Sequence, residues 1–469
     1  MMSRSFPSSV KNLPPSPHAL ALRLIYGMDL DIFDKADDAL YDALSHAPFD
    51  RLTPQERGLA TMLVNESLRW NLTLKSRLKT LTKKRFKDLQ APLRHLLLLG
   101  LLSVLHPQER EKERGYSQVQ AWVELAKACK LAPAQVGMLN ACLRRASEEL
   151  APLGEVDAHF KGTALERLSL ASGWPTWALK ELQQATDAET VDAYIQASHH
   201  KQPMTLFHTQ ARSQAEMQPV LQHLASHGIE THQPFLPDFP QAIHLEDALK
   251  GGITTLPAWD AGAWYVQDYG SAWVARHACD AMKAYESPVV VDLCAAPGSK
   301  TWWLAKAVEN RGHVHAVDVS AKRLERLAEN MTRLKLNERV TVHTADATTF
   351  TLATPADVVL VDAPCSALGT VSHHPDLWIN RSEASLKEFA PLQLAILSQA
   401  ASVCHASSTL IYSTCTWRVA ENQKVIEAFL KTHPDWRLVE EHTLPMTALH
   451  DGFYVAMLKR CSSLSSLHH

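Results

Sequence analysis

A short apolar run followed by a turn of small residues, at residues 289–301, constrains the fold more than any other part of the chain. The run V-V-V-D-L is rich in β-branched residues, as in a strand buried on both faces of a parallel sheet. The turn C-A-A-P-G follows at once, and S-K-T begins a predicted helix. Small residues let the backbone approach a ligand, and a helix start offers unpaired N–H groups. Strand, turn and helix together predict a nucleotide-type cradle.

The sequence of this turn excludes two better-known nucleotide-binding motifs. The turn has neither the G-x-G-x-x-G fingerprint of dinucleotide-binding folds nor the glycine spacing of a Walker A loop. An ordinary tight connection between a strand and a helix, without a ligand, is an alternative as long as the turn is considered alone. Groups further along the chain weaken that alternative.

Strands and helices alternate in the last 200 or so residues. Six segments have the composition of strands: residues 289–293, 314–317, 340–343, 357–361, 409–413 and 454–458. Helical patterns lie between them, most clearly at 321–334. The alternation predicts a Rossmann-like, doubly wound α/β domain, in which ligands bind at the carboxyl ends of the strands.

The chain of 469 residues is too long for one hydrophobic core, so we expect several domains. An almost wholly apolar stretch at 93–105 lies within a long helical pattern, which predicts a compact bundle. The predicted parts are a disordered tail (1–17), an all-α bundle (18–150), a helical connector (151–198), a small α+β module (199–264), the doubly wound domain (265–460) and a second tail (461–469).

Charge is balanced overall but concentrated in one stretch of the predicted bundle. The net charge of −3 argues against a uniformly basic nucleic-acid binder, so a polyanion must meet a local basic surface. Between residues 69 and 95 the only acid is Asp88, against nine basic residues: Arg69, Lys75, Arg77, Lys79, Lys83, Lys84, Arg85, Lys87 and Arg94. This basic cluster is either a solvated helix face or a surface that contacts RNA phosphates, and its sharpness favours RNA slightly.

Cysteine spacing indicates a reducing compartment, and hydropathy indicates a chain without a membrane span or a signal peptide. Eight cysteines without a C-x-x-C pair do not form a disulfide framework in a chain of this length. The sequence contains no run of 18 apolar residues, and residues 1–16 lack the apolar core of a signal peptide. We therefore expect a cytoplasmic protein that does not associate with membranes.

Two carboxylates follow the second and third predicted strands of the doubly wound domain. Asp318 lies 20 residues past Gly298, where an acid accepts hydrogen bonds from both ribose hydroxyls of NAD or S-adenosylmethionine (SAM). Asp346 follows the third strand, where a carboxylate accepts the exocyclic amine of an adenine. The alternative for Asp346 is a helix N-cap.

Two cysteines follow the next two strands. D-A-P-C-S places Cys365 after one strand, and S-T-C-T places Cys415 after the other. A free cysteine is usually a small buried hydrophobe. Two of them at strand ends, beside a cofactor cradle, favour chemistry instead. The residues around Cys415 include no obvious cation to lower its pKa.

These motifs, with C-A-A-P-G-S-K-T and the ending D-G-F-Y-V-A at 451–456, resemble the RNA (cytosine-5)-methyltransferases of the Sun (NSUN) family. The helical front resembles the NusB-like RNA-binding fold at residues 52–70, 93–105 and 138–145. Within the family, this combination is most similar to bacterial enzymes that act on small-subunit ribosomal RNA. The resemblance implies a SAM-dependent enzyme that methylates carbon 5 of a cytidine in RNA, above all 16S rRNA. We expect it to be monomeric and to need no metal.

The resemblance also assigns roles to residues. In this family the cysteine of the Thr-Cys motif attacks carbon 6, which implies that Cys415 is the nucleophile and that Cys365 assists release. The addition makes carbon 5 enamine-like, so that it attacks the methyl group of SAM. Asp362 is expected to hydrogen-bond the ring near N3, and Lys300 to contact the SAM carboxylate or the active site. The implied SAM site comprises Cys294, Ala295, Ala296, Pro297, Gly298, Ser299, Lys300, Asp318, Asp346 and Asp362.

Departures from the family pattern lie at Ser372-His373, where arginines are usual, and at 417–420, where a proline and another glutamate are usual. Trp417 is expected either to stack on a base or to pack. Leu206-Phe207-His208 stands where the family's small module has Arg-Val-Asn, which argues against an RNA contact at that strand.

Three other functions stay open. The first is the same chemistry on tRNA or another RNA. The second is a non-catalytic RNA-binding or ribosome-assembly factor that kept the fold, against which the two intact cysteine motifs argue. The third is an NAD-dependent oxidoreductase, which the glycine pattern of the turn disfavours.

Overall fold

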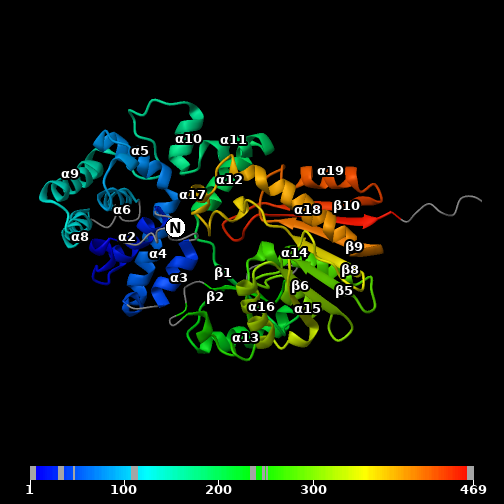
Figure 1. Cartoon of the computed structure of the whole chain (residues 1–469). Coiled ribbons are helices and arrows are strands. Elements are labelled where there is room, and N and C mark those ends of the chain that lie inside the picture. The colour runs from blue at the N-terminus through cyan, green and yellow to red at the C-terminus, as the bar shows by residue number, and fades with distance from the viewer. Residues whose placement is uncertain are drawn as a thin grey trace, which may run out of the picture. The chain divides into compact units, whose positions relative to one another are not determined.

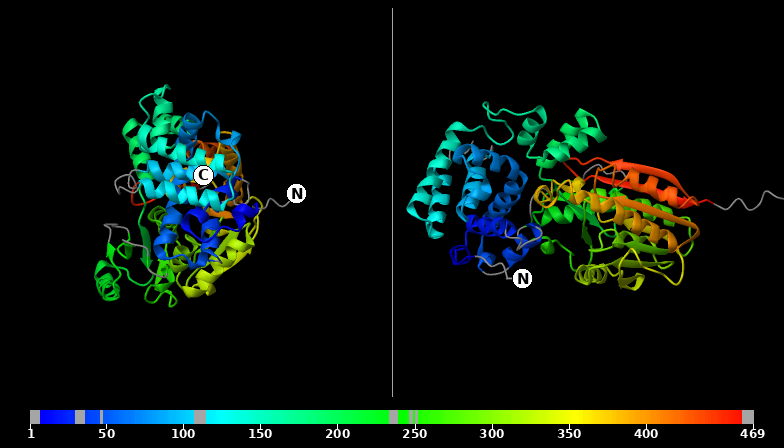
Figure 2. Two further views of the ribbon diagram at one scale, coloured as in Figure 1. Left: turned by 90° about the vertical axis from the view of Figure 1, so that its left-hand side faces the viewer. Right: turned by 45° about the horizontal axis from the view of Figure 1, so that its top comes forward.

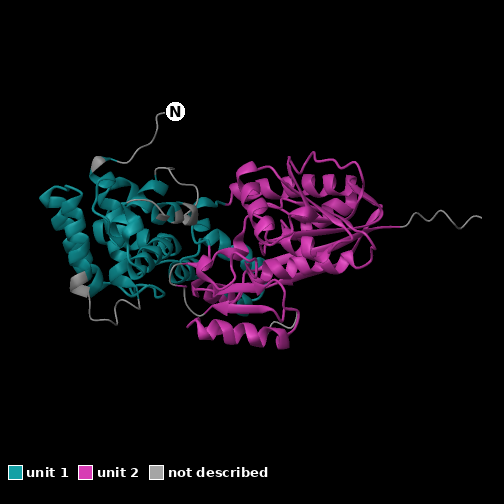
Figure 3. Cartoon of the chain, turned by 90° about the horizontal axis from the view of Figure 1, so that it is seen from below, with its two compact units in different colours: residues 1–191, 374–382 teal, residues 192–373, 383–469 magenta. Residues whose placement is uncertain are grey.

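The structure is a computed structural model that describes residues 7–29, 36–45, 48–106, 115–232, 239–245, 249 and 252–461. The chain forms two compact units, which Figure 3 shows in different colours. Unit 1 comprises residues 1–191 and 374–382, and unit 2 comprises residues 192–373 and 383–469. The boundary falls inside helix α12 (Ala188–His199), within the predicted connector. In the described part of the chain, no helix is both long and apolar enough to span a bilayer.

Unit 1 is the predicted helical bundle (Figure 1). Its helices are α1 (Ser8–Lys11), α2 (Pro17–Asp29), α3 (Ala36–Ser45), α4 (Pro54–Arg69), α5 (Asn71–Thr82), α6 (Leu93–Leu105), α8 (Gly115–Ala128), α9 (Pro133–Glu149), α10 (Ala164–Ser172), α11 (Thr176–Ala185) and α17 (Leu377–Asn380). Every residue of α6 except Arg94 is buried, as its apolar sequence predicts. Val10 and Leu13 are buried in the same core, so the bundle begins before the predicted boundary at residue 18.

The basic cluster contains two kinds of side chain. Arg69, Arg77 and Arg94 belong to the fold, because each is paired with an acid or with backbone carbonyls. Arg77, for example, is buried and donates to the carbonyls of Ala151 at 2.6 Å and Glu155 at 2.8 Å. The exposed lysines are Lys79, Lys83, Lys84 and Lys87. RNA contact by this cluster stays a prediction, and it now rests on those four lysines and on Arg85, which is exposed and paired with Asp88.

Unit 2 begins with the predicted small α+β module. Four antiparallel strands lie in the order β2-β3-β1-β4, together with the helix α13 (Gln214–Ser226). The strands are β1 (Met204–His208), β2 (Thr231–His232), β3 (Ala242–Leu245) and β4 (Trp264–Val266). Phe207 of β1 is fully buried, and its ring lies 5.4 Å from that of Trp303 in the next domain. The module therefore shares a core with the doubly wound domain.

The doubly wound domain has a seven-stranded sheet in the order β10-β11-β9-β8-β5-β6-β7. Its strands are β5 (Val289–Leu293), β6 (His313–Asp318), β7 (Val340–Thr344), β8 (Ala356–Asp362), β9 (Cys404–Thr414), β10 (Trp436–Leu444) and β11 (Phe453–Arg460). The strands β5 to β9 are parallel, and β11 is antiparallel to both β9 and β10. All six predicted strands are present; β10 was missed.

Helices cover both faces of this sheet (Figure 2). One core contains side chains of α14 (Tyr269–Met282), α15 (Thr301–Ala307) and α16 (Ala321–Arg333), and the other contains side chains of α18 (Phe389–Ser402) and α19 (Gln423–Thr432). The strand order reverses between β5 and β8, so the turn after β5 opens at the topological switch point of the sheet. Open α/β sheets bind ligands at such points.

Candidate active site

The turn after β5 brings backbone, not side chains, to the switch point. Cys294 has a φ of 66° and Gly298 a φ of 103°, and the peptide bond between Ala296 and Pro297 is cis. A Cβ at Gly298 would lie 2.9 Å from the side chain of Leu327, in a conformation that L residues rarely adopt. The sequence therefore needs glycine here, as the predicted cradle requires.

Asp318 ends β6 and holds the cradle to the next helix. Its carboxylate is 2% exposed; Oδ2 accepts the Ala296 N–H at 3.2 Å, and Oδ1 accepts the Ser320 N–H at 2.8 Å and Arg323 Nη2 at 2.8 Å. The acid that the sequence predicts for a ribose thus touches the predicted turn.

Asp346 lies in a turn after β7 and is exposed. Its Oδ1 accepts the Thr348 N–H at 2.8 Å and the Thr348 hydroxyl at 2.7 Å, and these bonds lower its pKa. Residues 347–349 form a turn, so the structure does not place Asp346 at a helix N-cap. A contact with adenine stays a prediction.

Asp292, the acid inside β5, was not among the predicted site residues. It is fully buried beneath the cradle; Oδ2 accepts the Thr301 hydroxyl at 2.7 Å, and Oδ1 has no hydrogen-bond partner within the described residues. Burial raises the pKa of Asp292 to about 7. The signal that identifies this residue is an acid within an otherwise apolar strand.

The pKa of Asp292 predicts a pH-dependent stability. An unfolded aspartate loses its proton near pH 4, whereas the folded protein keeps it to about pH 7, so between these values the folded state binds one more proton. The free energy of unfolding therefore falls as pH rises through this window. Asp292→Asn does not ionise and still accepts the Thr301 hydrogen bond, so we expect a flatter curve. Thermal melting of both proteins between about pH 5 and about pH 8 measures this, and parallel curves would contradict it.

Lys300 follows the cradle and points to the carboxyl end of β8. It is 5% exposed, and its Nζ donates to Asp362 Oδ2 at 2.7 Å and to Ser271 Oγ at 3.1 Å. Ser413 Oγ donates to the other oxygen of Asp362 at 2.8 Å. Burial is the largest single influence and acts to lower the pKa of Lys300, but the charge and hydrogen bond of Asp362, with smaller contributions from Cys415 and Asp292, together leave that pKa raised. Of its two predicted contacts, the geometry favours the active site.

The two predicted cysteines lie against one another. Strands β8 and β9 are parallel neighbours in which Asp362 pairs with Ser413, so the loops after them start side by side. The sulfur atoms of Cys365 and Cys415 are 3.3 Å apart; Cys365 is buried and Cys415 is partly exposed. The two thiols therefore meet because each cysteine follows the carboxyl end of one of two neighbouring parallel strands.

The pKa of Cys415 is raised well above its usual value. Contact with the Cys365 thiol is the largest cause, followed by burial and the charge of Asp362. The charge of Lys300 acts in the opposite direction. Lys300 is thus the cation that inspection of residues next to Cys415 could not identify, because it comes from a distant strand-to-helix turn.

Two residues of the departures at 372–373 and 417–420, Ser372 and Trp417, make hydrogen bonds within the fold. Trp417 is 7% exposed and donates Nε1 to the Leu368 carbonyl at 3.2 Å, which supports packing instead of base stacking. Ser372 Oγ donates to Asp451 at 3.4 Å. Atoms of His373, Asp268 and Asp451 that are able to bind a metal lie within 4.8 Å of one another. That no metal is needed stays a prediction.

Comparison with known proteins identifies both units. The model of the 16S rRNA methyltransferase RsmB/F family matches residues 280–459, and that of the NusB family matches residues 16–148. The probable ribosomal RNA small subunit methyltransferase B of Synechocystis sp. is 30% identical over 461 residues, which covers 92% of this chain and 97% of that protein. Ribosomal RNA small subunit methyltransferase B of Serratia proteamaculans is 30% identical over 420 residues, covering 87% and 90%.

Solved structures agree on the fold. The structure of PH0851 has a TM-score of 0.73 at 20% identity and covers 97% of this chain and 100% of that one. The structure of NSun6 from Pyrococcus horikoshii with SFG has a TM-score of 0.52 at 19% identity, covering 62% and 99%. The fold, the cradle and the relatives along nearly the whole sequence lead to one conclusion. The chain belongs to the RsmB/F family of 16S rRNA methyltransferases, which take their methyl group from SAM.

Proposed function

We propose that this protein methylates carbon 5 of a cytidine in 16S rRNA through a covalent bond between Cys415 and carbon 6 of the base. The contact between the two thiols, 3.3 Å apart at the ends of β8 and β9, carries the proposal. Methylation at a nitrogen or an oxygen needs no thiol, whereas carbon 5 of cytosine is too weak a nucleophile without one. The names of the curated relatives support ribosomal RNA as the substrate.

The residues of the cradle fit SAM. Gly298 holds the turn in a backbone conformation that L residues rarely adopt, Asp318 places its carboxylate against the turn, and Asp292 holds an unpartnered carboxylate oxygen beneath it. We assign residues 294–300, Asp318, Asp346 and Asp362 to its binding. SAM, when bound, supplies an electrophilic methyl group on a sulfonium cation.

The remaining steps belong to the protein. Cys415 gives its proton to solvent, with the positive charge of Lys300 acting to lower the pKa of the thiol, and its sulfur adds to carbon 6. The electron pair of the double bond between carbons 5 and 6 moves to carbon 5. Carbon 5 takes the methyl group and then carries both methyl and hydrogen. We assign the removal of that hydrogen as a proton to Cys365 in its thiolate form. The electron pair of the broken carbon–hydrogen bond restores the double bond between carbons 5 and 6, and the bond between carbon 6 and sulfur breaks to return the Cys415 thiolate.

Asp362 is assigned to the ring edge near N3. Lys300 and Ser413 each donate to one of its oxygens, at 2.7 and 2.8 Å, and so fix the plane of the carboxyl group. A carboxylate fixed in this way accepts a hydrogen bond from the amino group beside N3, while the positive charge of Lys300 acts on the negative charge that thiolate addition places on the ring.

Release of the carbon 5 hydrogen tests the proposal directly. 16S rRNA labelled with tritium at carbon 5 of cytidine is incubated with the protein and SAM that carries a ¹⁴C methyl group. We expect one tritium released for each methyl transferred. Methyl transfer without tritium release would mean another position on the base, and neither signal on rRNA, small subunits or tRNA would favour a non-catalytic RNA-binding factor. Bisulfite sequencing of RNA from a deletion strain then locates the cytidine.

A second prediction concerns the cofactor alone. Asp318→Asn removes the charge that strengthens hydrogen bonds to the ribose, which we expect to weaken SAM binding about a hundredfold, as the loss of about 3 kcal/mol implies. Calorimetric titration with SAM measures this. Arg323→Ala, which removes one of the three donors to Asp318 and keeps its charge, serves as the control and should bind SAM far more tightly than Asp318→Asn. Equal affinities of the two variants would remove Asp318 from the SAM site.

A further inference from the structure

We propose that Glu421 and Asn422 are positioning residues that set the distance between the two cysteines. Glu421 holds the Cys365 loop, defined as residues 363–366, and Asn422 holds the Cys415 loop, defined as residues 414–416. The inference rests on the function proposed above, and it assigns each catalytic step a separate support in the fold.

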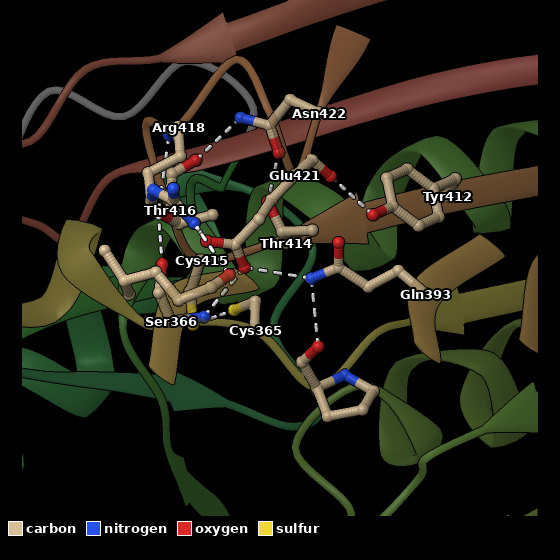
Figure 4. A network of polar contacts seen from close by, with 12 residues as sticks. Cys365, Ser366, Gln393, Tyr412, Thr414, Cys415, Thr416, Arg418, Glu421 and Asn422 are labelled. Carbon is tan, nitrogen blue, oxygen red and sulfur yellow. Dashed lines mark hydrogen bonds and ion pairs between the residues drawn. The ribbon is translucent and has the colours of Figure 1, made fainter. Parts of the chain in front are cut away.

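Glu421 ties down the backbone on both sides of Cys365, as Figure 4 shows. Its side chain is fully buried, and Oε2 accepts the Ser366 N–H at 2.8 Å and Gln393 Nε2 at 2.9 Å. The same Gln393 nitrogen donates to the Pro364 carbonyl at 3.0 Å. One carboxylate oxygen therefore fixes the residue before Cys365, through Gln393, and the residue after it directly.

Asn422 does the same for Cys415 (Figure 4). It is 1% exposed; Oδ1 accepts the Thr414 hydroxyl at 2.6 Å, and Nδ2 donates to the Thr416 carbonyl at 2.8 Å. These two partners are the immediate neighbours of Cys415. The amide thus holds the Cys415 loop by one bond accepted from a side-chain hydroxyl and one donated to a backbone carbonyl, a pattern that neither Asp nor Leu reproduces.

The two supports are joined to each other. Glu421 and Asn422 are consecutive, so both loops are tied to one point of the chain. The hydroxyls of Ser366 and Thr416 lie 2.9 Å apart and link the loops directly. The Tyr412 hydroxyl, inside β9, donates to the Glu421 carbonyl at 2.6 Å and fixes that point to the sheet.

Burying a carboxylate costs desolvation free energy, so its use to join two loops indicates that the positions of those loops must be fixed. Arg418 Nη1 lies 2.7 Å from Glu421 Oε1 and compensates its charge. Buried ion pairs add little to stability compared with apolar residues of the same size, whereas breaking one is strongly unfavourable. They restrict the backbone to arrangements that keep every partner in place. Here the restricted quantity is the spacing of two reacting sulfur atoms.

The two residues support different steps. Attack at carbon 6 needs only Cys415, whereas release needs Cys365 next to carbon 5. Loosening the Cys365 loop therefore slows release more than attack, so that the covalent RNA–protein adduct accumulates. Loosening the Cys415 loop slows attack itself, so that little adduct forms.

Two substitutions test this assignment. Glu421→Gln leaves one acceptor oxygen for three donors, and Asn422→Ala removes both bonds to the Cys415 loop. We expect each to lower kcat about a hundredfold, the cost of misplacing a reacting group by about 1 Å, with unchanged SAM affinity. SDS-resistant adduct with RNA should accumulate with Glu421→Gln and not with Asn422→Ala. Gln393→Leu, which releases the Pro364 carbonyl, should behave as Glu421→Gln does and serves as the second variant if that protein misfolds.

The control variant removes a contact that joins the same two strands, β8 and β9, at their other ends. His405 Nε2 lies 2.9 Å from Asp357 Oδ1, at the amino ends of β9 and β8. His405→Ala should lower the melting temperature without changing kcat or the adduct. Three results would overturn the assignment. The first is wild-type kcat in folded Glu421→Gln, and the second is adduct in both variants or in neither. The third is a fall in kcat in His405→Ala as large as that in the two variants.

A reporter that needs no RNA separates this inference from the proposed function. Diamide accepts two hydrogens from the Cys365 and Cys415 thiols and leaves a disulfide between them, which mass spectrometry detects. We expect rapid formation in the wild-type protein and slower formation in both variants. If wild-type protein releases no tritium from carbon 5, the proposed function fails. The rate of disulfide formation then still tests whether Glu421 and Asn422 set the distance between the two sulfur atoms. Equal rates in wild type and variants, or no disulfide in wild type, would overturn it.

Discussion

Cys415→Ala is expected to abolish methyl transfer to RNA while leaving SAM affinity unchanged. The thiol is the group assigned to bond with carbon 6, and without that bond carbon 5 does not attack the methyl group. Removing a covalent nucleophile costs about 10⁶-fold in kcat in well-studied enzymes, so activity should fall below detection. Transfer of labelled methyl groups to 16S rRNA measures the loss, and calorimetric titration with SAM shows that the cradle is intact.

Another cysteine of the same strand provides the control. Cys404 begins β9, whereas Cys415 follows its end; Cys404 is buried and its thiol donates to the Ala400 carbonyl. Cys404→Ala should lose some stability through the cavity it leaves, yet keep its activity. Methyl transfer by Cys415→Ala at more than a trace of the wild-type rate would remove the thiol from the reaction, whatever the behaviour of Cys404→Ala.

Strands with a clear apolar pattern, such as β5, could be predicted from the sequence, whereas β10 could not. The run of β-branched residues in β5 has no good alternative as a helix, and its turn of small residues marks the cradle. Strand β10 is largely exposed, with Glu440 and Glu441 facing solvent, so it carries neither alternation nor a continuous apolar run. Its place in the sheet follows from pairing with β11, which a single-sequence pattern does not contain.

The site divides in the same way. The proximity of Cys365 and Cys415 could be predicted, because parallel strands end at one edge of the sheet and both motifs follow strand ends. The contact between Lys300 and Asp362 could not, because it joins residues far apart in the chain whose side chains meet only after folding. Similarly, a count of charges does not distinguish Arg77, which is buried against carbonyls, from an exposed lysine such as Lys83.

Cys365→Ala is expected to trap the protein on its RNA. Cys415 still adds to carbon 6 and carbon 5 still takes the methyl group, but no thiol then removes the carbon 5 proton, so the bond to sulfur persists. The adduct appears as a protein band shifted in SDS that carries the label of the SAM methyl group. It should vanish in the double variant Cys365→Ala/Cys415→Ala. Normal turnover by Cys365→Ala, with an adduct from Cys415→Ala, would reverse the two roles.

The contact between the sulfurs adds a pH dependence to this result. Contact with Cys365 is the largest cause that raises the pKa of Cys415, so Cys365→Ala should lower that pKa toward its ordinary value. More of the attacking thiol is then ionised at a given pH, and adduct formation by the variant should reach half its maximum rate at a lower pH than attack by the wild type. Single-turnover rates across pH measure both. A profile that does not move would mean that the two thiols are not coupled before RNA binds.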